Sequence, residues 1–461
     1  MRIKENYAVI TKYVVTAECT TPLHIGNAVG SKDEVLIHPV DNKPFIQASS
    51  IAGAFRAYYE KHCENGETQL FGGIRYTDGG ESDSYESRIR FEDGIFLTQT
   101  EKVHLELRPR VSINPQTGSC ANSTVKGTTV NAGHKFNTEY VGAGSWIQFT
   151  LYVYDESENE EVENIIKAFG TGEILLGGQK SNGCGGCCLK KVLRKKFHMK
   201  ENSDRKLWTL EDILEEKQYE NITEQLSGAE AESYAYEITM DAETEGKLLV
   251  KAIAVTEYRK DEQGKDNTPD VMNIKNAKNE YIVPGSSVKG AVRSRMEQIA
   301  EYLNQKDVIK DTFGYTGSKG NMGKCGNIIF YDMVIGDRKQ NYDRQSDYRI
   351  HIDKFTGGVM HGGLFSEKNT AGKLQLKIRI KDENHPEKTC GLLILVLRDL
   401  AAGMYNLGSG YNVGKGFLKP GQIAVKEMKT HKQAIIKYTQ KPVCEDKDHV
   451  LAACLKSLKG V

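Results

Sequence analysis

The chain repeats itself, and this repeat constrains the fold more than any other feature of the sequence. A Ser-Ser-x-x-Gly-x-x-Arg element that begins at Ser49 returns at Ser286, an offset of 237 residues. An aspartate precedes each element by sixteen residues, at Asp33 and at Asp270. The two halves of the chain therefore share both a motif and a loop residue ahead of it.

Further matches follow in the same order along both halves. Residues 88–93 match 327–332, residues 110–114 match 349–353, and glycine-rich segments match at 176–185 and 407–416. Matches that keep their order over most of each half do not arise by chance. A chain of 461 residues also exceeds the usual size of a single domain. We expect two copies of one domain in tandem.

The order of the expected elements indicates the fold class. Each half opens with a strand, at 14–19 and 248–255, and the Ser-Ser element then begins a helix that runs to residue 62 or 303. A strand of period two (146–154 and 374–380), a second helix (161–169 and 392–404), a glycine loop and a closing strand follow. This is the split βαβ plan of α+β, ferredoxin-like domains.

This plan sets the domain boundaries. We predict a first domain over 1–198 with a long insertion at 94–143, and a second over 236–430 with an insertion at 333–370. The segment 199–235 is rich in Glu, Lys and Gln and is predicted to be a linker with a short amphipathic helix. Residues 431–461 are predicted to form a tail with one more short helix.

Composition excludes several classes of protein. The chain has no run of eighteen apolar residues and no apolar stretch at its start, so we expect no membrane span, no secretion signal and a cytoplasmic location. Its 10 cysteines are too sparse for a disulfide scaffold. Because 62 basic residues balance 62 acidic ones, a nucleic-acid partner has to be argued from local clusters.

The Ser-Ser element is a candidate phosphate site. The first turn of a helix presents unpaired N–H groups and a partial positive charge, and here hydroxyls and basic side chains stand beside it. The candidate RNA-binding residues are Ser49, Ser50 and Arg56 in the first copy and Ser286, Ser287, Lys289 and Arg293 in the second. The alternative is a capped helix whose arginine is a solvated surface charge.

The glycine loops are a second candidate, because glycine lets the backbone approach a polyanion closely. Lys180 and Lys415 lie in these loops and are candidate RNA-binding residues. Neither loop has the Gly-Lys-Ser/Thr ending of a nucleotide-hydrolysing P-loop. A turn with a glycine C-cap is the alternative. The Cys-x-x-Cys pair at Cys184 and Cys187 lacks a second pair of ligands nearby, so we do not expect zinc there.

Several of these motifs together resemble one protein family. The Pro-Leu-His-Ile-Gly turn at 22–26, the loop aspartate, the Pro-Gly-Ser-Ser-x-Lys-Gly helix start at 284–290 and the late glycine loop resemble the RAMP superfamily of CRISPR-associated proteins. The resemblance covers both halves. An aspartate in the first loop is similar to that of the backbone subunit of type III effector complexes. Two fused copies resemble the tandem backbone subunits of subtype D.

The resemblance implies RRM-like cores that hold a guide RNA, and thumb hairpins from the two insertions that intercalate into its duplex with target RNA. It implies metal-dependent cleavage at the loop aspartate, so that Asp33 and Asp270 would be catalytic and bind Mg²⁺ or Mn²⁺. His24 would assist in the first copy. The implied partners are guide RNA, target RNA, other RAMP subunits and the large subunit of a type III complex, in antiviral defence.

The two copies depart from the family pattern in different places. The first lacks a counterpart of Lys289, and the second aligns residues 256–259 with residues 23–26 and so lacks a counterpart of His24. Three alternatives stay open: a catalytically silent guide-RNA scaffold, a ribonuclease that processes precursor guide RNA, and a tandem RRM protein unconnected with CRISPR. The last would bind single strands through exposed aromatic residues on its sheets.

Overall fold

The computed structural model describes residues 8–26, 34–62, 70–76, 82–97, 103, 105–114, 123–125, 128–130, 135–210, 214–228, 231–253, 269–317, 323–337 and 347–459. The chain divides into two compact units. The first contains residues 1–106, 139–180 and 184–231, and the second contains residues 107–138, 181–183 and 232–461. Two pieces of the first half of the sequence, 107–138 and 181–183, therefore belong to the second unit.

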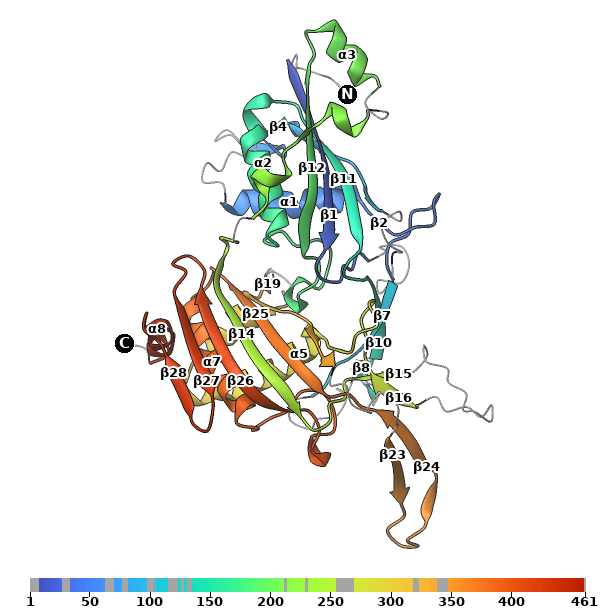
Figure 1. Ribbon diagram of the computed structural model, residues 1–461, viewed down its shortest axis with the longest axis vertical. Helices are drawn as coiled ribbons and strands as arrows, with labels where there is room; N and C mark the ends of the chain where they lie inside the picture. The colour runs from blue at the N-terminus through green and yellow to red at the C-terminus, as the bar shows by residue number, and fades with distance from the viewer. Residues whose placement is uncertain are drawn as a thin grey trace. The chain divides into compact units, whose positions relative to one another are not determined.

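One antiparallel sheet organises the first unit (Figure 1). Its central strands are β12 (Cys187–His198), β1 (Val9–Cys19), β11 (Trp146–Val153) and, beside β11, β5 (Ile89–Phe91) and β6 (Gly94–Phe96). Alternate residues of β11, among them Ile147, Phe149 and Leu151, are buried, as expected for a strand with one face on a core. The order fourth, first, third and second strand is that of a ferredoxin-like sheet.

Two helices complete the core of the first unit. They are α1 (Ala48–His62) and α2 (Asn159–Gly170). Ile51, Phe55 and Tyr59 recur every fourth residue along α1 and are buried. The Phe55 ring lies 5.9 Å from Phe149 of the sheet and 5.6 Å from Phe169 of α2, so one aromatic cluster joins both helices to the sheet.

The second unit repeats this plan. Its sheet has the order β20 (Ile328–Phe330), β25 (Gly372–Lys381), β14 (Tyr234–Glu245), β26 (Phe417–Glu427), β27 (Gln433–Tyr438) and β28 (Pro442–Glu445). Its main helices are α5 (Gly285–Tyr302) and α7 (Pro386–Ala401), and α8 (Val450–Ser457) packs on α7. The first four strands again have the ferredoxin-like order, so the predicted fold class is confirmed for both copies.

Most of the other helices and strands are short. They are β2 (Phe45–Ile46), β3 (Gly73–Tyr76), β4 (Ser82–Tyr85), β7 (Leu105–Val111), β8 (Ser123–Val125), β9 (Thr128–Val130), β10 (Lys135–Val141), α3 (Asn202–Trp208), β13 (Glu220–Asn221), α4 (Thr223–Leu226), β15 (Lys251–Ile253), β16 (Val271–Asn273), β17 (Ile282–Val283), α6 (Lys306–Phe313), β18 (Gly314–Tyr315), β19 (Lys324–Cys325), β21 (Met333–Val334), β22 (Gly336–Asp337), β23 (Asp347–Ile352) and β24 (Val359–Lys368). No helix within the described ranges has both the length and the apolar character needed to cross a membrane.

The predicted opening strand of the second copy is wrong. That strand is β14, which begins at Tyr234, whereas Leu248 forms an isolated bridge with Thr370 and only residues 251–253 are extended nearby. Leu23 forms the same kind of bridge with Val141 in the first copy. The counterpart of residues 23–25 is therefore 248–250, and the predicted alignment of residues 256–259 is also wrong.

Residues predicted as linker and tail are packed against the two sheets. Ile222 and Leu226 lie in the core of the first unit, and β13 pairs with β12. In the second unit, β27 and β28 widen the sheet and α8 contributes Leu451 to the core. These segments extend the two units along the chain.

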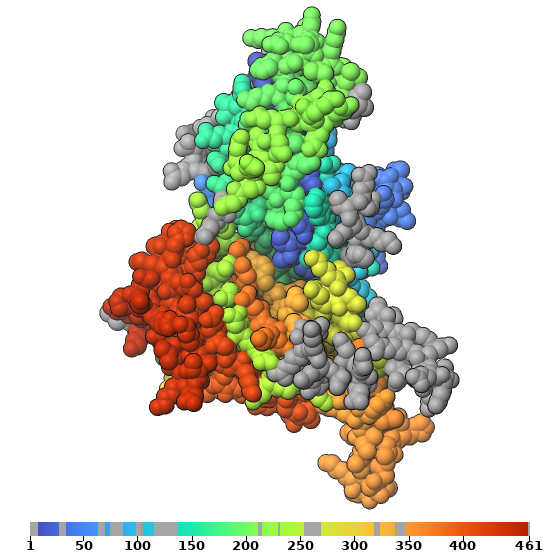
Figure 2. All heavy atoms as spheres, in the orientation of Figure 1, coloured from blue at the N-terminus to red at the C-terminus, as the bar shows by residue number. Residues whose placement is uncertain are grey.

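The hairpin of β23 and β24 carries apolar side chains on its surface. Tyr348, Ile350 and Leu364 are more than half exposed, and Phe355 at the turn is fully exposed. Ile350 lies opposite Leu364 in the pairing register, so these side chains share one face. Figure 2 shows this hairpin, in orange, projecting from the second unit.

Candidate nucleic-acid interface and catalytic loops

In each copy, an aspartate just ahead of a neighbouring strand caps the Ser-Ser helix at its first turn. Asp93 Oδ1 accepts a hydrogen bond from the Ala48 N–H at 2.7 Å in the first copy. Asp332 Oδ1 accepts one from the Gly285 N–H at 2.8 Å in the second. One N–H group of each predicted phosphate site is therefore already paired with a negative charge.

The serines after this cap stay accessible to different degrees. Ser49 is exposed and Ser50 half-buried, while Ser286 and Ser287 are both half-buried. The predicted arginines are exposed and each pairs along its own helix. Arg56 Nε lies 2.7 Å from Glu60 Oε1 and Arg293 Nε lies 2.8 Å from Glu297 Oε1. RNA binding by these residues remains a prediction.

The Lys289 side chain is more buried than that of a lysine that contacts phosphate at the protein surface. Its Nζ donates to Ser181 Oγ at 2.8 Å, in the short segment of the first half that belongs to the second unit. Burial lowers the pKa of Lys289, and the charges of Arg293 and Arg110 act in the same direction. A phosphate beside Lys289 would offset the repulsion among these positive charges.

Each glycine loop is closed by a backbone hydrogen bond between its two ends. The Leu176 N–H donates to Gly185 O and the Leu407 N–H donates to Gly416 O, both at 2.9 Å. A Cβ at Gly185 would lie 2.0 Å from the Leu176 carbonyl oxygen, and a Cβ at Gly416 would lie 2.0 Å from the Leu407 carbonyl oxygen. Both glycines also have positive φ. The glycines are therefore required by the fold itself.

The two predicted loop lysines have different surroundings. Lys180 is exposed at the start of a short 3-10 helix. Lys415 is 5% exposed, and its Nζ donates to Asn369 Oδ1 at 2.8 Å and pairs with Glu367. The structure thus places Lys415 within a buried network, while Lys180 stays on the surface.

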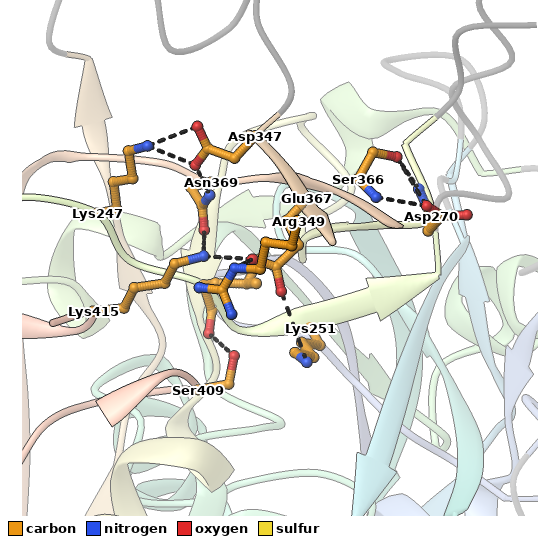
Figure 3. Close-up of polar contacts among 11 residues, drawn as sticks. Lys247, Lys251, Asp270, Asp347, Arg349, Ser366, Glu367, Asn369, Ser409 and Lys415 are labelled. Carbon is orange, nitrogen blue, oxygen red and sulfur yellow. Dashed lines mark hydrogen bonds and ion pairs between the residues drawn. The ribbon is translucent and has the colours of Figure 1, made fainter. Parts of the chain in front are cut away.

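Asp270 lies just ahead of β16 and is tied to β24 (Figure 3). Its Oδ2 accepts hydrogen bonds from the Ser366 N–H at 2.7 Å and from Ser366 Oγ at 3.0 Å. The Asp270 N–H donates to the same hydroxyl at 3.0 Å. Asp270 itself is exposed, and its Oδ1 accepts no hydrogen bond from the residues that the structure describes. The loop aspartate is fixed but retains one open carboxylate oxygen.

Glu367, the next residue, gathers three cations (Figure 3). Its carboxylate is 2% exposed and lies 2.5 Å from Lys415 Nζ, 3.2 Å from Arg349 Nε and 4.0 Å from Lys251 Nζ. Burying a carboxylate is costly unless it is paired, and these contacts offset that cost. Arg349 and Lys251 remain partly exposed, so the network carries positive charge to the surface.

A second carboxylate extends the network. Asp347 Oδ2 lies 2.6 Å from Lys247 Nζ and accepts a hydrogen bond from Asn369 Nδ2 at 2.5 Å. Asn369 in turn accepts from Lys415, so the chain of contacts is continuous from Lys247 to Glu367. Four cations face three carboxylates in this region when Asp270 is included (Figure 3).

In the first copy, His24 is placed against the glycine loop and Asp33 lies outside the described residues. His24 is 7% exposed, and its Nδ1 lies 2.7 Å from the Glu139 carbonyl oxygen. Because a carbonyl only accepts, Nδ1 carries the proton in the neutral ring and Nε2 carries the lone pair. Glu139 Oε2 also accepts from the Val35 N–H at 3.2 Å, which fixes the end of the loop that contains Asp33.

The residues at hand fit a divalent ion only in part. Asp270 offers one carboxylate oxygen, and no group of three His, Cys, Asp or Glu side chains in the described ranges is arranged to hold a metal. Hard cations such as Mg²⁺ accept phosphate and water oxygens as their other ligands. The described residues therefore supply at most one ligand to such an ion.

Sequence reasoning missed the residues that surround Asp270. Residues 366–370, Ser-Glu-Lys-Asn-Thr, form a run of five polar residues that are all buried. This run is the available signal, because consecutive buried polar residues need partners. Arg349 and Lys251 carry no motif, and their meeting at Glu367 depends on the fold.

Comparison with known proteins places the chain in a family. The model of the RAMP superfamily matches residues 16–188 and 241–419, more than half of the chain. No curated protein matches the sequence. Among the solved structures that match is a chain of the type III-B Cmr-beta complex bound to cognate target RNA, with 17% identity and a TM-score of 0.30. That match covers 41% of this chain and 61% of the other. With both halves matched and the same sheet order in each, the chain belongs to the RAMP superfamily.

Proposed function

We propose that the chain is a guide-RNA-binding backbone subunit of a type III CRISPR effector complex, and that it cleaves complementary target RNA at sites built around Asp33 and Asp270. Membership of the RAMP superfamily supports the general role. The observation that supports cleavage is the setting of Asp270. One exposed carboxylate is held by Ser366 at the base of an apolar hairpin, beside a network with excess positive charge.

Each part of this region has a role in the proposal. Arg349 and Lys251 contact phosphates of the paired RNA, since both are partly exposed and are oriented by Glu367. The apolar face of β23 and β24 inserts at the duplex and leaves one nucleotide unstacked. Asp270 Oδ1 holds or positions a Mg²⁺ ion, which stabilises charge that develops on the scissile phosphate.

A cleavage assay tests the proposal. The complex is reconstituted with guide RNA and end-labelled complementary RNA in Mg²⁺, and wild type is compared with Asp33→Ala, Asp270→Ala and the double variant. Asp446→Ala is the matched control. Asp446 also accepts a hydrogen bond from a backbone N–H, that of Ala452 at 2.9 Å, and it lies far from Asp33 and Asp270 in the sequence. We expect each single variant to lose its own product and the control to keep both. Products that survive the double variant contradict cleavage by this chain.

A silent scaffold is the second candidate, and the Ser366 contacts favour it. Asp270 makes the hydrogen bonds of an ordinary turn-fixing residue, so its charge need have no catalytic role. Asp270→Asn separates the two candidates, because an amide oxygen still accepts from Ser366 but binds divalent ions poorly. Full cleavage by Asp270→Asn favours the scaffold, and loss of cleavage with guide affinity retained favours the catalytic role.

A further inference from the structure

The two helix starts are equivalent down to single residues. In the first copy β2 pairs with β6, with Phe45 opposite Ile95. In the second, β17 pairs with β21, with Ile282 opposite Val334. Asp93 and Asp332 stand immediately before β6 and β21, and each caps the helix that follows its partner strand. The two carboxylates are therefore the same residue of the repeat.

Within the described ranges, only the second of these carboxylates is covered. Asp332 Oδ2 lies 2.6 Å from Arg108 Nη2 within the second unit, as an ion pair without hydrogen-bond alignment. The two side chains are 16% and 6% exposed. Asp93 is exposed, and in the described part of the chain its carboxylate accepts only the Ala48 N–H. The first copy has the cap without the arginine.

A shallow, open pocket of about 440 Å³ lies beside Asp93. Its lining residues are His38, Pro39, Phe45, Gln47, Ala48, Ser49 and Asp93, all in the first unit, and we name this pocket the Asp93 socket. The rings of His38 and Phe45 meet edge to face at 5.1 Å on its wall. A guanidinium is planar, stacks on aromatic rings and pairs with a carboxylate, so it matches this lining better than an ammonium does.

We propose that the Asp93 socket receives an arginine side chain from the hairpin of a neighbouring RAMP subunit, in the way that Asp332 receives Arg108. The proposal rests on the proposed function in one respect, namely that the chain assembles with other RAMP subunits. Beyond that function, it names the residues through which two RAMP subunits would be joined. It also fixes the polarity of the assembly, because the first copy accepts a hairpin.

The donor is a different subunit from this chain. The Arg110 guanidinium lies 5.2 Å from the Phe136 ring in the first hairpin, and Arg349 stands opposite Phe365 in the second. Aligning these two Arg–Phe pairs places Asp347 of the second hairpin, two residues before Arg349, at the position of Arg108. A second copy of the chain would bring Asp347 against Asp93, and two carboxylates repel. The socket therefore selects a RAMP subunit with arginine at this hairpin position and disfavours self-polymerisation.

The first copy also differs in how closely a neighbour can approach. A Cβ at Gly285 would lie 2.8 Å from Asn182 O, so the second copy admits a backbone carbonyl at its helix start. Ala48 stands at this place in the first copy and already carries a Cβ. The occupant of the Asp93 socket is therefore a side chain, because the Ala48 Cβ excludes a backbone segment as close as the one at Gly285.

A charge-swap experiment tests the proposal. The chain is mixed with the neighbouring RAMP subunits of its complex, without RNA and with guide RNA, and occupancy is measured by native mass spectrometry. We expect Asp93→Arg to weaken the neighbour at least tenfold, as loss of a buried charge pair does. A neighbour whose matching arginine is changed to aspartate should restore occupancy. Glu160→Arg makes the same charge change on the exposed face of α2 and should leave assembly unchanged.

Asp93→Asn keeps the test valid if Asp93→Arg does not fold, because the amide still caps Ala48 but lacks the charge. Unchanged assembly by a folded Asp93→Arg or Asp93→Asn chain overturns the proposal. So does concentration-dependent polymerisation of the wild-type chain that Asp93→Arg abolishes, which would make this chain its own partner. Failure of the free chain to bind guide RNA, with the RNA-free swap intact, would reject the proposed function and leave the socket standing.

Discussion

The two helix starts have one backbone arrangement and two electrostatic states. Asp332 is mostly buried with Arg108, whereas Asp93 is exposed beside an open pocket. A repeated motif thus preserves the hydrogen bond that the helix needs and leaves the other carboxylate oxygen to differ between copies. The difference separates what the fold requires from what contact with a neighbour requires.

The base of the thumb hairpin shows the same contrast. Aligning the Leu23–Val141 bridge with the Leu248–Thr370 bridge places Thr138 of the first copy at the position of Glu367 in the second. Aligning the glycine loops likewise places Cys184 at the position of Lys415. The first copy is neutral and buried at both positions, while the second buries an ion pair. In the second copy, the Glu367–Lys415 ion pair connects the glycine loop to the β23–β24 hairpin, whose strand β24 also holds Asp270.

The largest expected effect separates Asp332 from Asp93. Asp332→Ala removes an ion-pair partner of the buried Arg108 and also removes a helix cap, so we expect a loss of about 4 kcal/mol in the free energy of unfolding of the second unit. Asp93→Ala removes only the cap and should cost about 1 kcal/mol. Urea unfolding followed by hydrogen exchange in each unit measures both. Equal losses would mean that Asp93 is not the uncovered copy of Asp332.

Glu367→Gln tests the buried pair of the second copy. The amide leaves Lys415 charged in a site where it is 5% exposed, and we expect a loss of about 3 kcal/mol. The double variant with Lys415→Met should be more stable than Glu367→Gln alone, since no unpaired charge remains. Thr138→Val is the control in the first copy and should be near neutral, because the buried Thr138 hydroxyl makes no hydrogen bond to the residues that the structure describes. A stable Glu367→Gln would show that water reaches Lys415.

Local patterns predicted the fold of each copy well. The period-two strand over 374–380 and the helix that begins at the Ser-Ser element are set by nearby residues, and both are confirmed. The opening strand of the second copy was missed because Leu248 to Val250 is more apolar than β14. Yet Tyr236, Ile238 and Met240 alternate with polar residues along β14, which is the signal of a strand with one buried face.

The candidate site was predictable only at its anchors. Asp270 was found from its spacing to Ser286, but Ser366 lies 96 residues further along and pairs with it through the fold. Glu367 gathers cations from β15, β23 and the glycine loop, three segments with no shared motif. Sequence periodicity fixes which face a residue occupies, whereas contacts between distant loops depend on the register of strands.

Gly285→Ala sharpens the comparison at the helix start. The added Cβ would lie 2.3 Å from Phe330 O and 2.8 Å from Asn182 O, both backbone atoms, so we expect a loss of about 2 kcal/mol in the second unit. The reverse change in the first copy, Ala48→Gly, should cost less than about 1 kcal/mol, since it creates no clash. Thermal unfolding of the two variants measures the difference. A neutral Gly285→Ala would show that neither Phe330 O nor the 181–183 segment is held this close to the helix start.

The smallest effect on stability is expected at Arg56 and Arg293, where RNA affinity is the informative measurement. Each pairs with a glutamate one turn along its helix, so Arg56→Ala or Arg293→Ala should cost about 0.5 kcal/mol or less. If each contacts a phosphate, the slope of log affinity for guide RNA against log salt falls by about one per variant. Glu60→Ala and Glu297→Ala are the controls, since they release the same arginines and should retain or strengthen binding. A salt slope that changes only for Arg293 would assign the guide contact to the second copy and leave the first helix to protein partners.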